Sequence, residues 1–314
     1  MIVTRAPTRI DFGGGWTDVP PYCEREQGFV CNVAIDRYAT ATVVEGAREH
    51  TERDDELIAA AIRRSGLADI RVTVDNDFPI GAGLGGSSAA SAAVLGALGA
   101  WQTAPWDLCG IAEQGRVIEV EDLGVAGGRQ DHYAATHGGA LALTFTDAVD
   151  VRRIPLSDVT RAALERRAML VYTGESRLSG DTITAVLDAY LARDRRVLVS
   201  LRRMKELAEQ MAAELEAGDI DDLAAMVAEH WVFQRQLNPA IPTPLIDTII
   251  AKATAAGAVG AKALGASGGG CVLVIAPSEG VEPVRVAVEA LGALLPFHVD
   301  VQGLCALSAG QEQE

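Results

Sequence analysis

The chain has 314 residues, enough for two domains of about 150 residues that each bury a core. Hydrophobic residues make up 49% and charged residues 22%, and the formal net charge of -16 argues against a nucleic-acid or anionic-membrane surface. Five scattered cysteines, no apolar leader and no run of about 18 apolar residues predict a cytoplasmic protein with free thiols.

The N-terminal region reads as strand, loop and strand. Alternation over residues 1 to 12 predicts a strand that is broken by Pro7. Residues 16 to 22 form a loop between glycines and prolines, and residues 28 to 44 return to a β-rich pattern.

A charged amphipathic helix over residues 50 to 66 and a strand over residues 70 to 76 come next. Residues 79 to 100, PIGAGLGGSSAASAAVLGALGA, then make a glycine-rich turn that leads directly into a small-residue helix. Glycines let the backbone approach a ligand closely, and a helix start leaves N–H groups unpaired, so this turn is typical of a phosphate site. The residues predicted to hold the phosphates are Gly81, Gly83, Leu84, Gly85, Gly86, Ser87 and Ser88.

Two other interpretations of this turn stay open. Gly81, Gly83 and Gly86 also spell the dinucleotide fingerprint G-x-G-x-x-G, with Asp107 at about the right distance for the ribose acid. Asp107 follows a Pro-containing connection rather than a second buried strand, which disfavours a dinucleotide. The turn also suits close helix packing, although four glycines and two serines exceed that need. No Lys follows the glycines, so a Walker loop is excluded.

Carboxylates gather in the next region. Residues 107 to 121 predict a helix that carries Glu119, and the loop G-G-R-Q-D after it carries Asp131. Without context, both acids are read as solvated or capping groups. His132 and His137 are five residues apart with no third ligand, so we interpret them as pocket or packing residues rather than as a metal site.

The second half opens with a charged segment over residues 151 to 168, which we predict to be helical. We place the domain boundary there, with domains over residues 1 to 160 and 161 to 314. A strand follows, and residues 181 to 235 show helical periodicity interrupted by a Gly-Asp stop and cap.

Glycines return near the C-terminal end. A helix over residues 246 to 257 precedes the segment KALGASGGGCVLVIAP, which has strand-like ends around glycines that include Gly268 and Gly269. A glycine hairpin is its plainest interpretation. A helix over residues 284 to 296 and the strand FHVDVQGLCAL follow.

Three motifs occur in an order that resembles the GHMP kinases, the superfamily of galactokinase, homoserine kinase and mevalonate kinase. The first is R-A-P-T-R-I-D-F-G-G-G-W-T-D, the second is P-x-x-x-G-L-G-x-S-S-A, and the third is the glycine segment at 262 to 277. The first motif and G-G-R-Q-D-H-Y are most similar to D-glycero-D-manno-heptose 7-phosphate kinases and to the kinase domain of L-fucokinase, where Gln is common in place of His132.

The resemblance implies an α+β fold of two domains, ribosomal-S5-domain-2-like at the N-terminus and ferredoxin-like at the C-terminus. Each domain would be a mainly antiparallel sheet with helices on one side, and the active site would lie in the cleft between the domains.

The resemblance also implies an ATP-dependent sugar kinase that uses Mg²⁺ and phosphorylates an anomeric hydroxyl. Asp131 would accept the proton of that hydroxyl, and Arg9 would neutralise charge near the γ-phosphate. Ser88 and Glu119 would ligate Mg²⁺. The implied sugar ligands are Asp18, Trp16, Thr17, Gly128 and Arg177, while Gly268 and Gly269 complete the ATP site.

Heptose 7-phosphate is the expected substrate, and a free sugar such as fucose or galactose is the alternative. Gln234 and Gln236 stand where lysines are common in the family, so charges that hold a distal phosphate are lost, but Arg177 and Arg235 remain. A non-catalytic sugar or nucleotide sensor is the alternative of another class, although the acids, the serines and Arg9 are all retained. A homodimer stays open.

Overall fold

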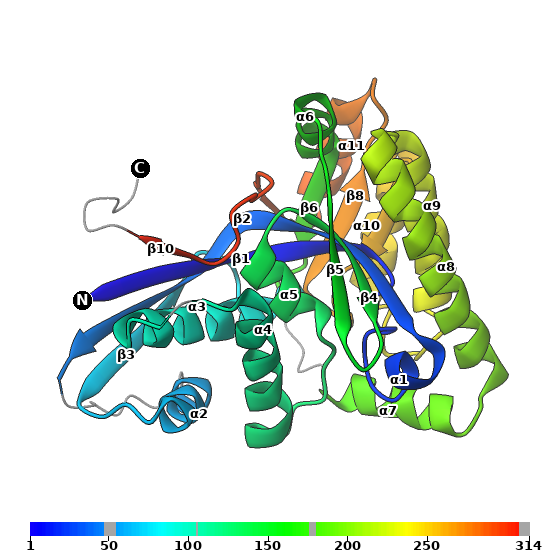
Figure 1. Ribbon diagram of the computed structural model, residues 1–314. Helices are drawn as coiled ribbons and strands as arrows, with labels where there is room; N and C mark the ends of the chain where they lie inside the picture. Colours follow the sequence, from blue (N-terminus) through cyan, green and yellow to red (C-terminus); the bar gives the residue numbers. More distant parts are fainter. Residues whose placement is uncertain (47–54, 105, 176–179, 308–314) are drawn as a thin grey trace.

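The computed structural model describes residues 1–46, 55–104, 106–175 and 180–307. In these ranges the chain forms two sheets, one of six strands and one of four, and their strand pairs are antiparallel. Helices cover both sheets (Figure 1), which confirms the predicted α+β class.

The larger sheet has the order β10-β1-β2-β4-β5, with β3 also paired to β2. Its strands are β1 Ile2–Gly13, β2 Gly28–Glu45, β3 Ile70–Asn76, β4 Ala140–Phe145, β5 Val149–Ile154 and β10 Cys305–Leu307. Pro7 does not break β1 as predicted. The strand continues through it with a shift of register between Pro7 and Thr8, because an irregularity in the ladder tolerates a residue without an N–H donor.

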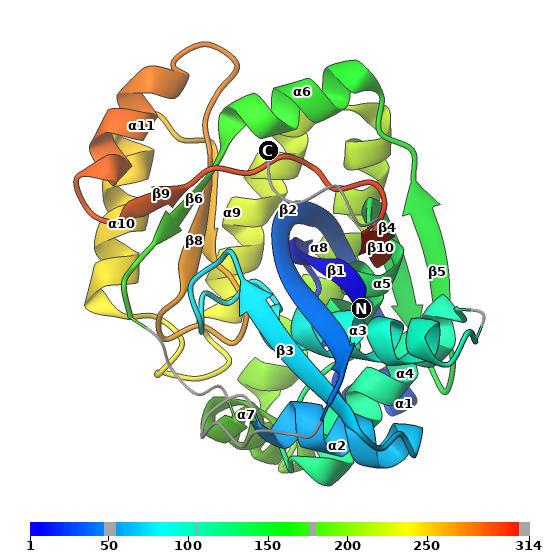
Figure 2. The ribbon, with the colours of Figure 1, turned by 90° about the vertical axis from the view of Figure 1, so that its left-hand side faces the viewer.

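The smaller sheet has the order β7-β8-β6-β9 and lies beside the larger one (Figure 2). Its strands are β6 Ala168–Tyr172, β7 Gly260–Ala263, β8 Cys271–Ile275 and β9 Ala293–Leu295. The central strand β8 is buried along its whole length, in keeping with its unbroken apolar sequence CVLVI.

Most helices follow the predicted periodicity, but the helix expected over residues 284 to 296 ends at Glu289 and is followed by the strand β9. The helices are α1 Tyr22–Glu26, α2 Asp55–Ser65, α3 Gly86–Trp101, α4 Leu108–Val117, the π-helical turn η1 Ile118–Asp122, α5 Gln130–His137, α6 Asp158–Arg167, α7 Gly180–Leu191, α8 Arg195–Ala217, α9 Ile220–Gln234, α10 Pro244–Ala255 and α11 Val281–Glu289. The Gly-Asp stop is confirmed: Gly218 ends α8 in the left-handed conformation, and Asp219 caps α9. Among the described residues, every helix is too short or too polar to span a bilayer.

Helices cover both faces of the larger sheet, not one face as predicted. On β4, Leu141 and Leu143 pack with Tyr133 of α5, whereas the alternate residue Ala142 packs in a cluster with Leu207 of α8. Successive side chains of a strand point to opposite faces, so α5 and α8 lie on opposite sides. A helix of the second half therefore closes the core of the first half (Figure 1).

Two further details differ from the sequence-based expectation. The charged segment from residue 151 begins as the strand β5 rather than as a helix, because Val149 and Val151 alternate with exposed residues and pair along β4. In addition, β10 lies in the larger sheet, so a boundary between residues 160 and 161 assigns this strand to the other half of the sequence.

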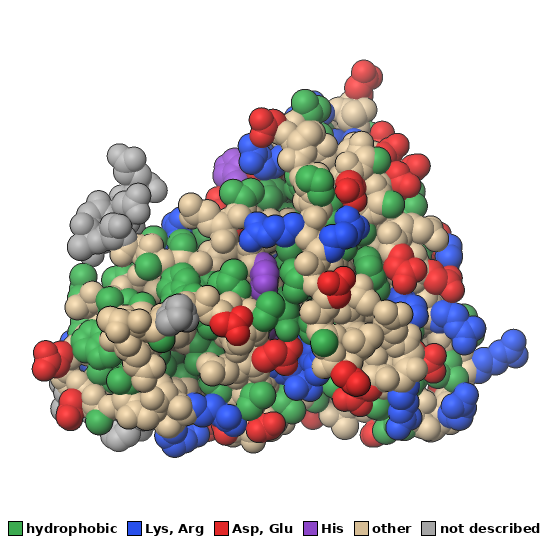
Figure 3. All heavy atoms as spheres, in the orientation of Figure 1, with side chains coloured by type: hydrophobic (Ala, Val, Ile, Leu, Met, Phe, Trp, Pro, Cys, Tyr) green, Lys and Arg blue, Asp and Glu red, His purple; other side chains and the backbone are tan. Residues whose placement is uncertain are grey.

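The surface agrees with the net charge. On the face shown in Figure 3, Lys and Arg side chains are separated by acidic and apolar ones and form no continuous stripe.

Candidate active site

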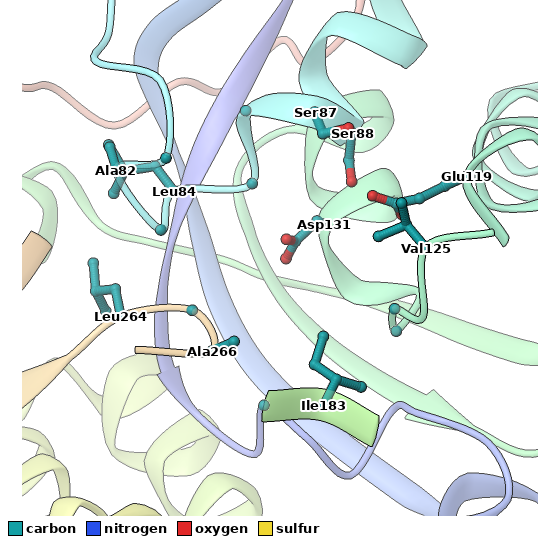
Figure 4. A pocket seen from close by; sticks show the side chains of 18 of the residues that line it. Ala82, Leu84, Ser87, Ser88, Glu119, Val125, Asp131, Ile183, Leu264 and Ala266 are labelled. Atoms are coloured by element: carbon teal, nitrogen blue, oxygen red, sulfur yellow. The ribbon is translucent and has the colours of Figure 1, made fainter. Parts of the chain in front are cut away.

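A pocket of about 750 Å³ lies between the two halves of the chain (Figure 4). The first half contributes the glycine turn and the start of α3, which include the predicted residues Gly81 to Ser88. The second half contributes the start of α7 and the loop after β7, including Gly269. The pocket therefore lies between the two halves of the chain, where the active site is expected.

The glycine turn has the geometry of a phosphate site. Gly85 takes the left-handed conformation (φ 76°) at the N-cap of α3, and the backbone N–H groups of the first helical turn follow it. A Cβ on Gly85 would lie 3.0 Å from Asp131 Cγ, so glycine also leaves room for that carboxylate. Asp107 is the N-cap residue of α4 rather than the end of a strand, which removes support for the dinucleotide interpretation.

The loop between β7 and β8 supports this turn from the second half. The Cys271 N–H donates to Ala82 O at 2.8 Å, and a Cβ on Gly83 would lie 2.9 Å from Leu264 O. The two backbones thus pack directly on each other. Gly269 lines the pocket, whereas Gly268 is buried behind it and donates its N–H to Ile241 O at 2.8 Å.

Arg9 and Asp131 form a two-pronged ion pair beside the turn. Arg9 Nε lies 2.8 Å from Asp131 Oδ1 and Nη2 lies 2.9 Å from Oδ2, while Nη1 donates to Gly83 O at 2.6 Å. The Arg9 side chain is 3% exposed and that of Asp131 is 27% exposed. The guanidinium is therefore held in place on three sides, and the carboxylate that it orients faces the pocket.

Asp18 reaches the same pocket from the loop after β1. Its Oδ2 accepts the backbone N–H groups of Arg129 at 2.8 Å and Gln130 at 3.0 Å, where α5 begins. Burial raises the pKa of this carboxyl to about 6, against the Gln130 hydrogen bond, and the charge of Asp131 raises it further. Gly128 is needed for this contact, because a Cβ there would lie 1.9 Å from Asp18 Oδ2.

The structure divides the other predicted sugar ligands. Trp16 and Gly128 line the pocket. Thr17 is buried and does not line it: its hydroxyl donates to Gly14 O at 2.7 Å and accepts the Phe29 N–H at 3.1 Å. Thr17 thus fixes the loop that carries its neighbours. Arg177 lies outside the described residues.

Ser88 and Glu119 converge on one side of the pocket (Figure 4). Ser88 comes from the first turn of α3, and Glu119 comes from the π-helical turn η1. Both approach the same nitrogen, since His132 Nε2 lies 3.0 Å from Glu119 Oε2 and 3.4 Å from Ser88 Oγ. A hydroxyl and a carboxylate oxygen in one place are donors suited to a hard divalent cation.

Asp11 and Lys262 form a buried ion pair that the sequence did not indicate. Lys262 Nζ lies 3.3 Å from Asp11 Oδ2 and 3.3 Å from Phe12 O, and both charged side chains are almost fully buried. Burial lowers the pKa of the Lys262 ammonium, and the Asp11 carboxylate opposes that shift. The pair joins β7 of the second half to β1 of the first and places Asp11 in the pocket wall.

The two glutamines that the resemblance places where lysines are expected do not line the pocket. Gln234 is buried, and its Nε2 donates to Ala263 O at 3.2 Å and to Ser267 Oγ at 3.1 Å beneath the loop between β7 and β8. Gln236 follows the end of α9, and its Nε2 donates to Val232 O of that helix at 2.9 Å. Arg235 is likewise held elsewhere, by Asp247 at 3.1 Å.

Two family models match this chain. The GHMP kinases N terminal domain matches residues 53–139, which contain the glycine turn, and the GHMP kinases C terminal domain matches residues 211–294.

Several proteins are similar along most of the chain. A D-glycero-alpha-D-manno-heptose 7-phosphate kinase of Campylobacter jejuni is 26% identical over 96% of this chain and 98% of its own length. A bifunctional fucokinase/GDP-fucose pyrophosphorylase of Arabidopsis thaliana is also 26% identical, over 90% of this chain, which spans 30% of that longer protein.

The structural comparison agrees. The crystal structure of a D-glycero-D-manno-heptose 1-phosphate kinase from Bacteroides thetaiotaomicron superposes with a TM-score of 0.79 at 25% identity, covering 98% of this chain and 99% of that one. Since the two matched models together span more than half of the chain and include the turn that lines the pocket, this chain belongs to the GHMP kinase family.

Proposed function

We propose that this chain is an ATP-dependent sugar kinase that phosphorylates the anomeric hydroxyl of D-glycero-D-manno-heptose 7-phosphate. The observation that carries the proposal is the pairing of Asp131 with Arg9 beside a glycine turn at a helix N-terminus. Phosphoryl transfer needs mainly positioning and charge neutralisation, and this pocket combines a carboxylate, a cation and unpaired N–H groups.

The chain's own residues account for the proton and the charge. The sugar oxygen attacks the γ-phosphorus, the bond from that phosphorus to the leaving ADP oxygen breaks, and the hydroxyl proton passes to Asp131. Arg9 keeps both Asp131 oxygens in a fixed orientation through its two N–H contacts. Asp18 lies in the same pocket, where its carboxylate orients the sugar by accepting hydroxyl hydrogen bonds.

The donors of this pocket fit Mg²⁺. Ser88 Oγ and Glu119 Oε2 both lie within 3.4 Å of one histidine nitrogen and line the pocket, so the two oxygens face a common space beside the glycine turn. These two residues would hold the ion, which supplies positive charge to the phosphate oxygens. ATP supply and the five unpaired cysteines favour the cytoplasm as the place of the reaction.

The similarity to heptose 7-phosphate and fucose kinases supports a sugar as the phosphate acceptor, with a heptose phosphate as the first candidate substrate. One observation favours a neutral sugar as the second candidate. Among the described residues that line the pocket, Arg9 is the one basic side chain, and it is already bound to Asp131. The acidic side chains there are Asp11, Asp18, Glu119, Asp131 and Asp181.

A panel of substrates separates these candidates. We expect kcat/KM for heptose 7-phosphate to exceed that for heptose, fucose, galactose and mannose by tenfold or more, with product phosphorylated at the anomeric oxygen. A tenfold preference for an unphosphorylated sugar would establish the free-sugar kinase instead. Sugar binding by calorimetry without turnover on any member of the panel would point to the non-catalytic sensor.

A further inference from the structure

His132 is buried like a packing residue, but its side chain contacts two polar groups of the site. It belongs to α5 directly after Asp131, and its side chain is 2% exposed. Its Nε2 faces both residues proposed to bind the cation, at 3.0 Å from Glu119 Oε2 and 3.4 Å from Ser88 Oγ. His132 does not itself line the pocket, so it lies behind the two oxygen donors rather than among them.

The chemistry of the pair fixes the direction of the hydrogen bond. An ionised carboxylate can only accept hydrogen bonds, so His132 Nε2 carries the hydrogen and donates the hydrogen bond to Glu119 Oε2. The Glu119 side chain is 16% exposed and extends from the π-helical turn η1, where it would otherwise rotate about its side-chain bonds. The imidazole therefore selects one carboxylate orientation, next to the Ser88 hydroxyl.

The helix packed against His132 is shaped to admit the ring. A Cβ on Gly115 of α4 would lie 2.8 Å from His132 Nδ1 and 2.9 Å from Ser91 Oγ, inside normal contact distance. Glycine in a helix interior costs stability relative to alanine, about 0.5–1 kcal/mol. The ring thus takes space that only a residue without a side chain leaves open.

We propose that His132 is a positioning residue that holds Glu119 beside Ser88 as a preformed pair of oxygen donors for the divalent cation. The inference rests on the proposed function, because it assigns the cation to these two oxygens. Groups that hydrogen-bond a metal ligand typically change metal affinity 10- to 100-fold when they are removed. A residue that only fills the core would change the binding of metal and of metal-free nucleotide alike.

The test measures the binding of a non-hydrolysable β,γ-imido analogue of ATP by calorimetry, once with Mg²⁺ and once with EDTA. In the unmodified protein, Mg²⁺ should tighten analogue binding. In His132→Leu we expect this gain to fall by about 10- to 100-fold, while metal-free affinity stays within about threefold. His132→Gln keeps an N–H donor and should regain most of the gain.

Two further variants sharpen the result. His137→Leu is the matched control, because His137 lies on the same helix but contacts Thr136 and Cys109 rather than Glu119. It should leave the Mg²⁺ gain unchanged. Gly115→Ala should reduce the gain as His132→Leu does, even though alanine favours the helix.

The outcomes distinguish the inference from the function on which it rests. An unchanged Mg²⁺ gain in folded His132→Leu overturns the positioning role, whatever the turnover. An equal loss with Mg²⁺ and with EDTA overturns it too, because it would show a general structural defect. If the variants differ in the Mg²⁺ gain as expected but the unmodified protein phosphorylates no sugar, only the proposed kinase reaction is overturned. If the unmodified protein does not bind the analogue at all, both the reaction and the positioning role are overturned.

Discussion

Asp18→Asn should make the protein more stable at neutral pH and remove part of the pH dependence of its stability. The carboxyl is buried and accepts two backbone N–H groups through one oxygen. Asparagine keeps an oxygen that can accept the same two bonds, and it carries no charge at any pH. The substitution therefore isolates the cost of burying the charge.

The raised pKa sets the size and the direction of the effect. The pKa of Asp18 rises from 3.8 to about 6 on folding, a shift of about 2 units, and each unit corresponds to 1.36 kcal/mol. The folded state binds this proton more tightly than the unfolded state. Proton binding at Asp18 therefore contributes its full stabilisation below pH 3.8. This contribution to the free energy of unfolding is lost as pH rises through 6, by about 3 kcal/mol in total.

Urea unfolding of both proteins at pH 4, 5, 6 and 7 measures the difference directly, because the other carboxyl groups titrate in both and cancel. We expect the free energy of unfolding of the unmodified protein, relative to Asp18→Asn, to fall by about 2 kcal/mol between pH 4 and 7, because part of the total effect lies below pH 4. A difference that stays constant over this range would refute the buried, destabilised carboxylate. The KM for the sugar should rise in the same variant, because the side chain proposed to accept hydrogen bonds from the sugar hydroxyls loses its negative charge.

Three other substitutions test the pocket. Asp131→Asn should lower kcat by roughly 10²-fold or more with nucleotide affinity nearly intact, and near-normal turnover would remove Asp131 from the mechanism. Lys262→Met should lower the free energy of unfolding by about 3–5 kcal/mol, because it leaves the Asp11 carboxylate buried without its partner. Adding Asp11→Asn should cost less than the sum of the two single changes, and strict additivity would show that the pair is not coupled. Gly128→Ala places a Cβ 1.9 Å from Asp18 Oδ2 and should raise sugar KM at least tenfold, whereas an unchanged KM would mean that this contact does not shape the sugar site.

The sequence by itself determined the local structure and the chemistry of the motifs. The periods of the apolar residues predict the strands at 28 to 44 and 70 to 76 and most helices of the second half, because these patterns depend on near neighbours. The glycine turn is equally local, since the residues that bend the chain and begin α3 are adjacent. Family resemblance added the carboxylates, because Asp131 and Glu119 have no distinctive pattern of their own.

Only the tertiary structure decided which distant groups meet. Lys262 lies 251 positions from Asp11, and nothing in its own segment distinguishes it from a surface lysine until β7 is placed against β1. The same holds for β10, which joins the first sheet from the end of the chain, and for Gln234, which turns under a loop rather than into the pocket. The period of the apolar residues specifies which face of a helix or strand is buried. The partner of a buried charge depends on which element covers that face, and this is decided by the packing of the whole core.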